Sequence, residues 1–285
     1  MVNALTVDVE DYFQVSAFDG VVPRSHWDRI ERRVVANTRR LLDLFDEAGV
    51  HATFFVLGWV SEREPALVRA IADRGHELGS HGYGHRLLYE QNAHVFAEDL
   101  RRAKHSIEDA AGRPVMGYRA PSFSITPSSQ WALDVLAEHG YAYDASVYPI
   151  RHDRYGMPGA SRHPYVEQRA GGRLVEAPGT TVEIGGFVLP AAGGGYFRLY
   201  PYHLTRWAIR RVNARDRQPA IVYVHPWEVD PDQPRVRVGL AKRLRHYVNL
   251  RRTEPRLRRL VADFRFAPLA DVLRGLGLLR PGAAA

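Results

Sequence analysis

The first short apolar run of the chain, residues 4–9, ends among three carboxylates: Asp8, Glu10 and Asp11. Asp8 and Glu10 are two positions apart, so on a strand their side chains share one face. Two carboxylates on one face repel each other unless a cation or a proton relieves them. This strand end is therefore a candidate cation site, and the alternative is a solvated strand end that caps the next element.

A pair of histidines follows another short strand. The string Ser-His-Gly-Tyr-Gly-His places His81 and His85 four positions apart, a spacing that lets two imidazoles point at one metal ion. The intervening glycines let the backbone turn sharply. Because the chain has 13 histidines, such pairs also arise by chance. The position at a strand end favours a metal site.

Two further strand ends carry single candidates. Arg119 ends a short β-like run and could hold a neighbouring carboxylate ionised and oriented, or it could be a surface arginine like most of the 39 Lys and Arg. His225 ends the apolar run 220–224 and is suited to acid–base work, with a buried structural histidine as the alternative. Two histidines and a carboxylate on a metal, a second carboxylate as base and a separate histidine as acid make a hydrolytic site.

Composition narrows the chemistry. The chain has 285 residues and no cysteine, so disulfides, thiolate metal sites and cysteine nucleophiles are excluded, and any metal must be held by His, Asp or Glu. No apolar run approaches the roughly 20 residues of a membrane span. The start of the sequence, Met-Val-Asn, shows no basic region of a signal peptide. These features predict a cytoplasmic protein.

Strand-like and helix-like segments alternate along most of the chain, which predicts a parallel sheet with helical crossovers, either open or closed into a barrel. The pattern breaks at residues 148–200, where only residues 174–177 and 182–189 suggest short strands. The predicted strands are 4–9, 53–57, 76–80, 117–119 and 220–224, and the predicted helices are 34–47, 65–73, 93–111, 127–139, 202–215, 238–250 and 254–264.

The formal net charge is +7 and much of it lies at residues 206–217 and 235–259, on predicted helices beyond the candidate strand ends. This placement argues against nucleic acid as a partner. It favours attraction to an anionic membrane surface or an acidic glycan precursor, with a plain solvated face as the alternative.

The motifs and their order resemble those of the polysaccharide deacetylases with a NodB homology domain (carbohydrate esterase family 4). The matching span is about residues 5–228: the acidic strand end, the histidine pair, Arg-Ala-Pro at 119–121 and Val-His-Pro at 224–226. The strings Asp-Val-Glu-Asp-Tyr-Phe (8–13), Gly-Gly-Gly-Tyr-Phe-Arg (193–198) and His-Pro-Trp-Glu (225–228) are similar to those of a subgroup linked to exopolysaccharide loci of Gram-negative bacteria.

The resemblance implies a distorted (β/α) barrel with about seven parallel strands, a loop-rich insertion near 150–200 and a helical extension at 229–280, in one catalytic domain over residues 1–285. It also implies removal of N-acetyl groups from amino sugars with a divalent metal, foremost Zn²⁺, with Co²⁺, Ni²⁺ or Mn²⁺ as alternatives.

Family roles carry over residue by residue. The resemblance implies that His81 and His85 are metal ligands, Asp8 the catalytic base, Arg119 its orienting partner and His225 the catalytic acid. The N–H after Pro121, that of Ser122, would stabilise the oxyanion.

The first motif departs from the family pattern, since Val9 stands where most members have a metal-binding Asp. Glu10 is favoured over Asp11 as the carboxylate ligand, because strand periodicity puts it on the face of Asp8. Asp144 is a candidate support for His225. Tyr196 and Trp227 could stack on sugar rings, and arginines of the insertion, Arg154 and Arg198 among them, could meet acidic groups, or both sets could simply pack.

The expected partner is an N-acetylated glycan or a lipid- or nucleotide-linked glycan precursor, and the enzyme would lie in the cytoplasm, in peripheral contact with the inner membrane. Two rival functions are an allantoinase-like amidohydrolase of a small cyclic amide and a non-catalytic carbohydrate-binding relative. The sequence leaves the oligomeric state open.

Overall fold

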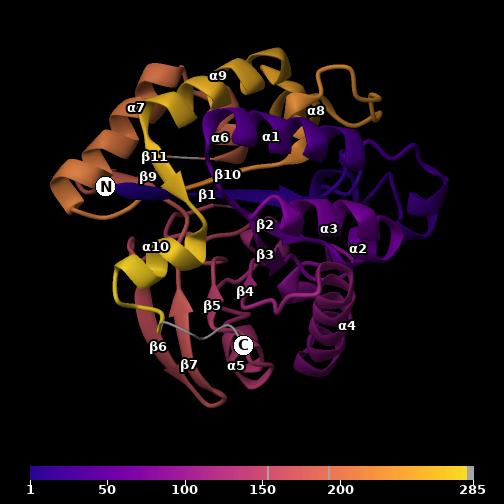
Figure 1. The fold of residues 1–285 in the computed structure, drawn as a ribbon, viewed down its shortest axis with the longest axis horizontal. Coiled ribbons are helices and arrows are strands. Elements are labelled where there is room, and N and C mark those ends of the chain that lie inside the picture. The colour runs from indigo at the N-terminus through magenta and orange to yellow at the C-terminus, as the bar shows by residue number, and fades with distance from the viewer. Residues whose placement is uncertain (153, 192, 281–285) are drawn as a thin grey trace.

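A mostly parallel sheet forms the centre of the protein (Figure 1). The computed structural model describes residues 1–152, 154–191 and 193–280. The strand order is β10-β1-β2-β3-β4-β5-β7-β6, and β11 also pairs with β1. The strands of this sheet are β1 (Val2–Val9), β2 (Thr53–Val56), β3 (Glu77–Ser80), β4 (Gly117–Tyr118), β5 (Tyr143–Asp144), β6 (Tyr165–Arg169), β7 (Gly172–Glu176), β10 (Ile221–Val224) and β11 (Arg265–Ala267).

All pairings from β10 through β7 are parallel, and only β6 runs antiparallel, as the first strand of a hairpin with β7. The predicted α/β architecture with a parallel sheet is confirmed. The helices are α1 (Val34–Ala48), α2 (Gly58–Arg63), α3 (Pro65–Asp73), α4 (Ala93–Ala111), α5 (Trp131–Glu138), α6 (Gly194–Leu199), α7 (Tyr202–Arg211), α8 (Leu240–Tyr247), α9 (Leu250–Asp263) and α10 (Leu269–Gly275).

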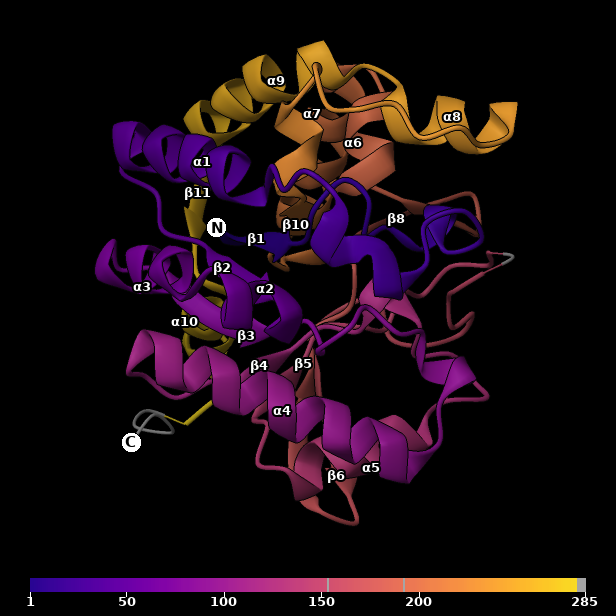
Figure 2. The same ribbon diagram turned by 90° about the vertical axis from the view of Figure 1, so that its right-hand side faces the viewer.

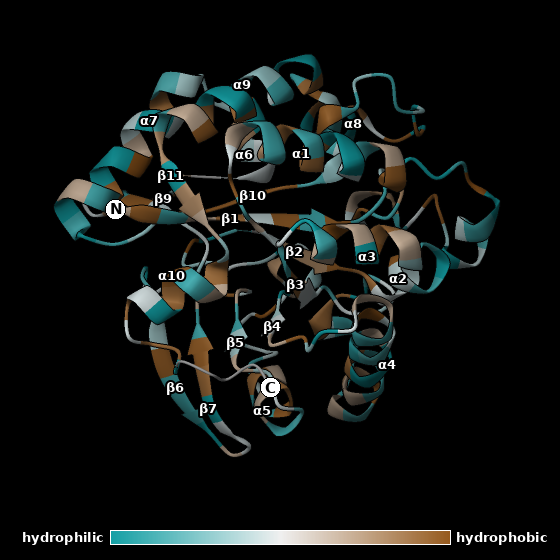
Figure 3. Ribbon diagram, viewed as in Figure 1, coloured by the Kyte–Doolittle hydropathy of each residue, from teal (hydrophilic) through white to brown (hydrophobic). Residues whose placement is uncertain are grey.

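The central strands are buried on both faces, so alternate residues face two different layers. Leu5, Val7 and Val9 of β1 join the large core that packs under the outer helices. The residues between them point into the sheet's curve, where Ala4 meets Phe55 and Tyr143, and α10 adds Leu269. The ribbon in Figure 3 is coloured by hydropathy, and there α4 and α9 are largely hydrophilic whereas β7 and β10 are largely hydrophobic.

The curved sheet has a seam between β7 and β10. Beyond β7, the hydroxyl of Thr180 accepts a hydrogen bond from the Ile221 N–H (2.6 Å) and donates to the Ile221 carbonyl (3.1 Å). The Thr180 side chain therefore makes hydrogen bonds to β10 where a neighbouring strand would otherwise make them. The arrangement agrees with the distorted barrel that the sequence resemblance implies.

The segment near 150–200 differs from a loop-rich insertion. Residues 172–176 form β7, which pairs with β5 and belongs to the main sheet. Residues 181–184 and 187–190 form a separate hairpin, β8 (Thr181–Ile184) with β9 (Phe187–Pro190). The sequence suggested short strands at 174–177 and 182–189, and the structure has β7 at 172–176 and two strands, β8 and β9, in place of the second. β6 was not predicted.

The C-terminal part is not a purely helical extension. β11 pairs with the start of β1, and α10 covers the inner cluster. The helix predicted from 254 begins at Leu250, because Pro255 lies inside α9 rather than at its start. Figure 2 looks onto the end of the sheet where β1 stops, and there α8 extends away from the body of the molecule.

Candidate metal centre and catalytic cavity

The carboxyl ends of β1, β3 and β10 open into one cavity of about 590 Å³. Among the predicted site residues, those that line it are Asp8, Glu10, His81, His85, Ser122, Tyr196, His225 and Trp227. Parallel strands place their carboxyl ends at the same edge of a sheet, which explains why residues so far apart in sequence meet here.

Glu10, His81 and His85 offer three donor atoms that all lie within 4.8 Å of one another. All three side chains are buried. His81 donates from Nδ1 to the Arg119 carbonyl (2.8 Å) when in that tautomer, which leaves its Nε2 to the cluster. Two imidazoles and a carboxylate are a donor set suited to Zn²⁺ and similar divalent metals, so the residues fit a metal.

Charge and burial act in opposite directions within this cluster. Burial would raise the pKa of Glu10, but His85, whose Nε2 lies 2.8 Å from Oε2, and the other histidines hold it well below its ordinary value. Burial lowers the pKa of His81 to about 4. Glu10 is therefore an anion and His81 neutral near pH 7, which are the protonation states that metal ligands need.

Asp11, the alternative carboxylate ligand, lies outside this cluster. Its oxygens accept hydrogen bonds from the backbone N–H groups of Tyr12 (2.9 Å), Arg33 (2.8 Å) and Val34 (3.0 Å). Those groups include the start of α1, whose first N–H groups lack partners within the helix. Strand alternation turns Glu10 inward and leaves Asp11 to anchor this helix.

Asp8 and Arg119 form a buried ion pair next to the cluster. One guanidinium nitrogen of Arg119 donates to Asp8 Oδ1 (2.8 Å) and to the Thr6 hydroxyl (2.6 Å), and Nε donates to the Ala145 carbonyl (3.2 Å). Three acceptors on two strands thus fix the guanidinium. Asp8 keeps its second oxygen, Oδ2, toward His225 Nε2 at 3.8 Å.

The partner of His225 is Glu228, which the sequence reading missed. His225 Nδ1 lies 2.6 Å from Glu228 Oε1. The 3-10 turn Pro226–Val229 brings them together, because side chains three positions apart eclipse in that geometry. Burial alone would lower the pKa of His225, but Glu228 and the carboxylates of β1 raise it to about 9. The three-residue spacing in His-Pro-Trp-Glu was the available signal.

Arg198 stands behind Glu228 rather than at the cavity surface. It is 2% exposed, and its Nε lies 3.5 Å from Glu228 Oε2. Another of its nitrogens donates to the carbonyls of Arg245, His246 and Val248 at the end of α8. Arg198 therefore joins the support of His225 to the rim of the cavity, and it is not available to meet an acidic sugar.

Asp144 does not support His225. It is fully buried at the end of β5, where its carboxylate accepts from the Ser146 hydroxyl and Glu176 lies beside it. Burial and the charge of Asp144 raise the pKa of Glu176 well above its ordinary value. Ser146 in turn accepts from the Ala120 N–H (2.7 Å), so this acid pair holds the loop after β4.

That loop carries Pro121 and Ser122. Pro121 begins a 3-10 turn, and Ser122 has a φ of 52°, in the left-handed region that is rare for residues other than glycine. Ser122 lines the cavity, and its hydroxyl lies 2.8 Å from that of Ser16. A strained backbone at a cavity wall is a common feature of functional sites.

Of the two aromatic candidates, only Tyr196 has the freedom to meet a ligand. Trp227 is 4% exposed and stacks between His225 (centroids 5.1 Å apart) and His246 (4.2 Å). Its indole N–H donates to Glu10 Oε1 at 3.0 Å. Trp227 therefore orients Glu10 and supports His225, because both faces of its ring are covered. Tyr196 pairs with Tyr155 through their hydroxyls (3.2 Å).

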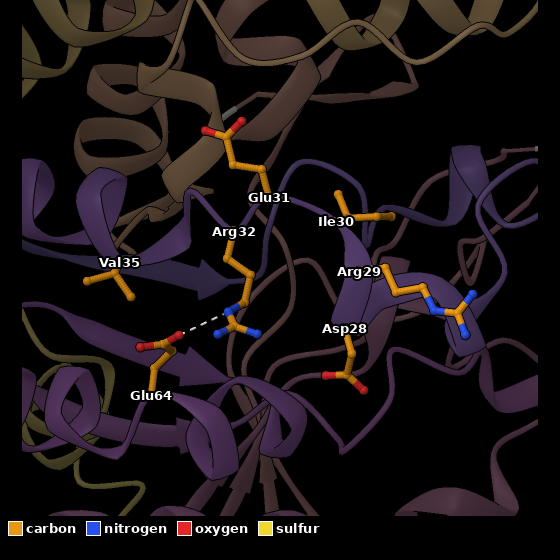
Figure 4. Close-up of a pocket in the computed structure, with 7 residues that line it drawn as sticks. All are labelled: Asp28, Arg29, Ile30, Glu31, Arg32, Val35 and Glu64. Carbon is orange, nitrogen blue, oxygen red and sulfur yellow. Dashed lines mark ion pairs between the residues drawn. The ribbon is translucent and has the colours of Figure 1, made fainter.

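A second hollow of about 410 Å³ lies near the start of α1 (Figure 4). Its walls are mostly charged side chains, of which Arg32 and Glu64 form an ion pair at 3.0 Å. It contains no histidine among its described lining residues, and none of the candidate catalytic side chains reaches it.

Comparisons with known proteins divide the chain into two matched segments. Residues 24–143 match the polysaccharide deacetylase family model, and residues 145–274 match a domain of unknown function, DUF3473. The first segment contains His81, His85 and Arg119, whereas His225 and Glu228 lie in the second. Both segments contribute strands to the same sheet.

Curated relatives match over part of their length. The chain is 32% identical over 108 residues to a peptidoglycan deacetylase of Helicobacter pylori, which covers 38% of this chain and 36% of that protein. It is 28% identical over 119 residues to a peptidoglycan-N-acetylglucosamine deacetylase of Bacillus cereus, over 38% of this chain and 43% of that protein. The matched part is thus less than half of either relative.

Solved structures match along nearly the whole chain. A putative polysaccharide deacetylase from Mycobacterium smegmatis superimposes with a TM-score of 0.64 at 23% identity, over 98% of this chain and 93% of that one. The Puue allantoinase gives a TM-score of 0.61 at 15% identity, over 98% and 90%. At these identities the likeness concerns the fold. The polysaccharide deacetylase family model matches residues 24–143, from the segment before α1 to the start of β5.

Proposed function

We propose that the protein is a metal-dependent hydrolase that removes N-acetyl groups from amino sugars of a glycan. One observation carries the proposal: the three-donor cluster of Glu10, His81 and His85 shares a cavity with a buried, ion-paired Asp8 and with His225. Amide hydrolysis needs an activated water, a stabilised oxyanion and a proton for the leaving nitrogen. We assign a side chain or backbone group of the cavity to each need.

Glu10, His81 and His85 would hold the metal, and the donor set favours Zn²⁺, with Co²⁺, Ni²⁺ or Mn²⁺ as alternatives. When bound, such an ion polarises the acetyl carbonyl and lowers the pKa of water. Asp8, held in place by Arg119, accepts the proton of the attacking water. The N–H of Ser122 stabilises the oxyanion from the other side of the cavity.

His225 donates the proton to the leaving amine. Its pKa near 9 keeps it protonated at neutral pH, and the hydrogen bond from Nδ1 to Glu228 directs Nε2 toward the carboxylates of β1. The two catalytic groups therefore start in opposite protonation states, as an acid and a base must.

The proposed substrate is an N-acetylated glycan or its lipid- or nucleotide-linked precursor in exopolysaccharide biosynthesis, handled in the cytoplasm at the inner face of the membrane. The resemblance to the exopolysaccharide-locus subgroup and the basic helices support this assignment. Within the described residues, none of the helices combines the length and apolar character that crossing a bilayer requires.

The test is acetate release by the zinc-loaded protein from chito-oligosaccharides and from peptidoglycan fragments, with allantoin as a third substrate. The proposal expects acetate from an N-acetylated glycan, none after chelation, and recovery on adding metal. Turnover of allantoin alone would favour the cyclic-amide rival. Glycan binding without any acetate would make the protein a non-catalytic relative.

A further inference from the structure

The rim of the catalytic cavity carries positive charges that the proposed chemistry does not use. Lys242 and Arg245 of α8 line the cavity, and so does Arg154. Among the described residues, none of the three has an ion pair. The Arg154 guanidinium donates to the backbone carbonyl and the hydroxyl of Ser16, at 3.4 and 3.3 Å.

The acidic groups of the cavity are already engaged. Three described lining residues are carboxylates, and all lie on its floor: Asp8 pairs with Arg119, Glu10 with His85, and Glu228 with His225. The cavity therefore has a neutralised floor and a positive rim.

The charge of α8 belongs to a longer basic segment. Residues 233–253 contain seven Arg and Lys and no Asp or Glu, so this segment alone matches the net charge of +7 of the chain. Unpaired like charges repel one another and destabilise the folded state unless an anion relieves them. Two members of the segment, Lys242 and Arg245, face the cavity, whereas Arg243 on the same helix does not line it.

The position of α8 is fixed relative to the catalytic groups. Arg198 holds the carbonyls at its end and also faces Glu228, the partner of His225. Arg154 contacts Ser16, whose hydroxyl lies within hydrogen-bond distance of that of Ser122. The rim cations thus lie at set places around the reacting centre rather than on a loose surface.

We propose that Lys242, Arg245 and Arg154 form an anion subsite that binds a carboxylate or phosphate group of the glycan substrate, away from the acetamide that reacts. The proposal rests on the proposed deacetylase function and adds the substrate class, an acidic rather than a neutral N-acetylated glycan. Exposed cations bind anions in a salt-dependent way, so the preference is largest at low ionic strength.

Three probes test the subsite: neutral chitotetraose, a tetrasaccharide that alternates N-acetylglucosamine with glucuronate, and uridine diphosphate N-acetylglucosamine. The proposal expects a lower KM for at least one anionic probe than for chitotetraose, and the probe that gains identifies carboxylate or phosphate. The variant Lys242→Gln/Arg245→Gln should raise that KM by about 10-fold and leave the KM for chitotetraose unchanged. Arg243→Gln is the matched control and should change neither value.

Calorimetric binding of the same probes to the metal-free protein separates this proposal from the proposed function. Binding of an anionic probe that depends on Lys242 and Arg245, without acetate release from any probe, would keep the subsite and refute the deacetylase. Acetate release with equal KM for neutral and anionic probes would overturn the subsite alone. The subsite would also be overturned if Arg243→Gln raised the KM for the anionic probe as much as the double variant does. It would likewise be overturned if the double variant lost binding to anionic phospholipid vesicles while its KM for every probe stayed unchanged.

Discussion

The floor and the rim of the cavity are built in opposite ways. On the floor, Asp8, His81 and Arg119 are at most 2% exposed, and each has a defined partner on a neighbouring strand or loop. On the rim, Lys242 and Arg245 are exposed and lack carboxylate partners among the described residues. Strand ends in a packed sheet hold the floor side chains among several partners, whereas the rim cations stand on a surface helix with their charges unpaired in the described part of the chain. The contrast predicts that floor changes affect turnover and rim changes affect substrate choice.

The largest effect is expected from the floor. The double variant His81→Ala/His85→Ala should lose metal binding and lower acetate release by about 1000-fold, since it removes two of three donors. Metal analysis and an acetate assay check this. The exposed His105→Ala is the control and should keep both properties. Full zinc stoichiometry in the double variant would refute the site.

A smaller loss of activity is expected from Glu228, which supports His225 from behind the floor of the cavity. Glu228→Gln keeps the shape of the side chain but removes the charge beside His225 Nδ1 and Arg198. Partners of this kind are worth about 10- to 100-fold, so kcat should fall by that amount while KM and metal content stay constant. Steady-state kinetics measure kcat and KM of this variant. Glu183 is exposed, so Glu183→Gln serves as the control and should change neither value. A change confined to KM would place Glu228 in substrate binding.

Glu10 and Asp11, which are adjacent at the end of β1, should have different effects when they are replaced. Glu10→Gln should weaken metal binding, whereas Asp11→Ala should keep the metal and lower the free energy of unfolding by about 1–2 kcal/mol, because it removes the acceptor for the start of α1. Denaturant unfolding and metal titration on both variants check this. Metal loss in Asp11→Ala without loss of stability would reverse the assignment.

The smallest effect concerns pH and the acid pair beneath the loop after β4. Glu176 has a raised pKa when folded, so the folded state binds its proton more tightly than the unfolded state. Its contribution to stability therefore falls as the pH rises above the ordinary value of 4.5. Glu176→Gln should remove this decline and show a flatter stability profile between pH 5 and about 8. The measurement is the denaturant midpoint of both proteins at several pH values across that range. If the midpoint of Glu176→Gln fell with pH as steeply as that of the unchanged protein, the prediction would be wrong.

Local periodicity was enough to predict much of the floor. The inward turn of Glu10 followed from the two-residue period of a strand, and His81 and His85 followed from their spacing at a strand end. What could not be predicted depends on packing between distant segments. Arg198 reads as a surface cation in a glycine-rich stretch, and only the fold shows the α8 carbonyls and Glu228 around it.

The same limit explains the errors in the middle of the chain. β7 is five residues long and is the second strand of a hairpin with β6, so nothing local reveals that it also pairs with β5. Asp144 stands at a strand end like the catalytic residues, but the strand alternation directs it to Ser146 and Glu176 instead of the cavity. Trp227 looked like a sugar platform because a sequence does not show which ring faces are already covered.

The pairing of β1 has a consequence for how the chain folds. β1 hydrogen-bonds with β2, β10 and β11, and the side chain of Asn3 reaches the carbonyl of Arg265 across a sequence separation of 262 residues. The strand that carries Asp8 is therefore synthesised well before β10 and β11, and it gains its last neighbours only after both have been made. Such long-range closure slows folding and leaves strand edges exposed meanwhile, so the nascent chain depends on protection until residues 265–267 emerge.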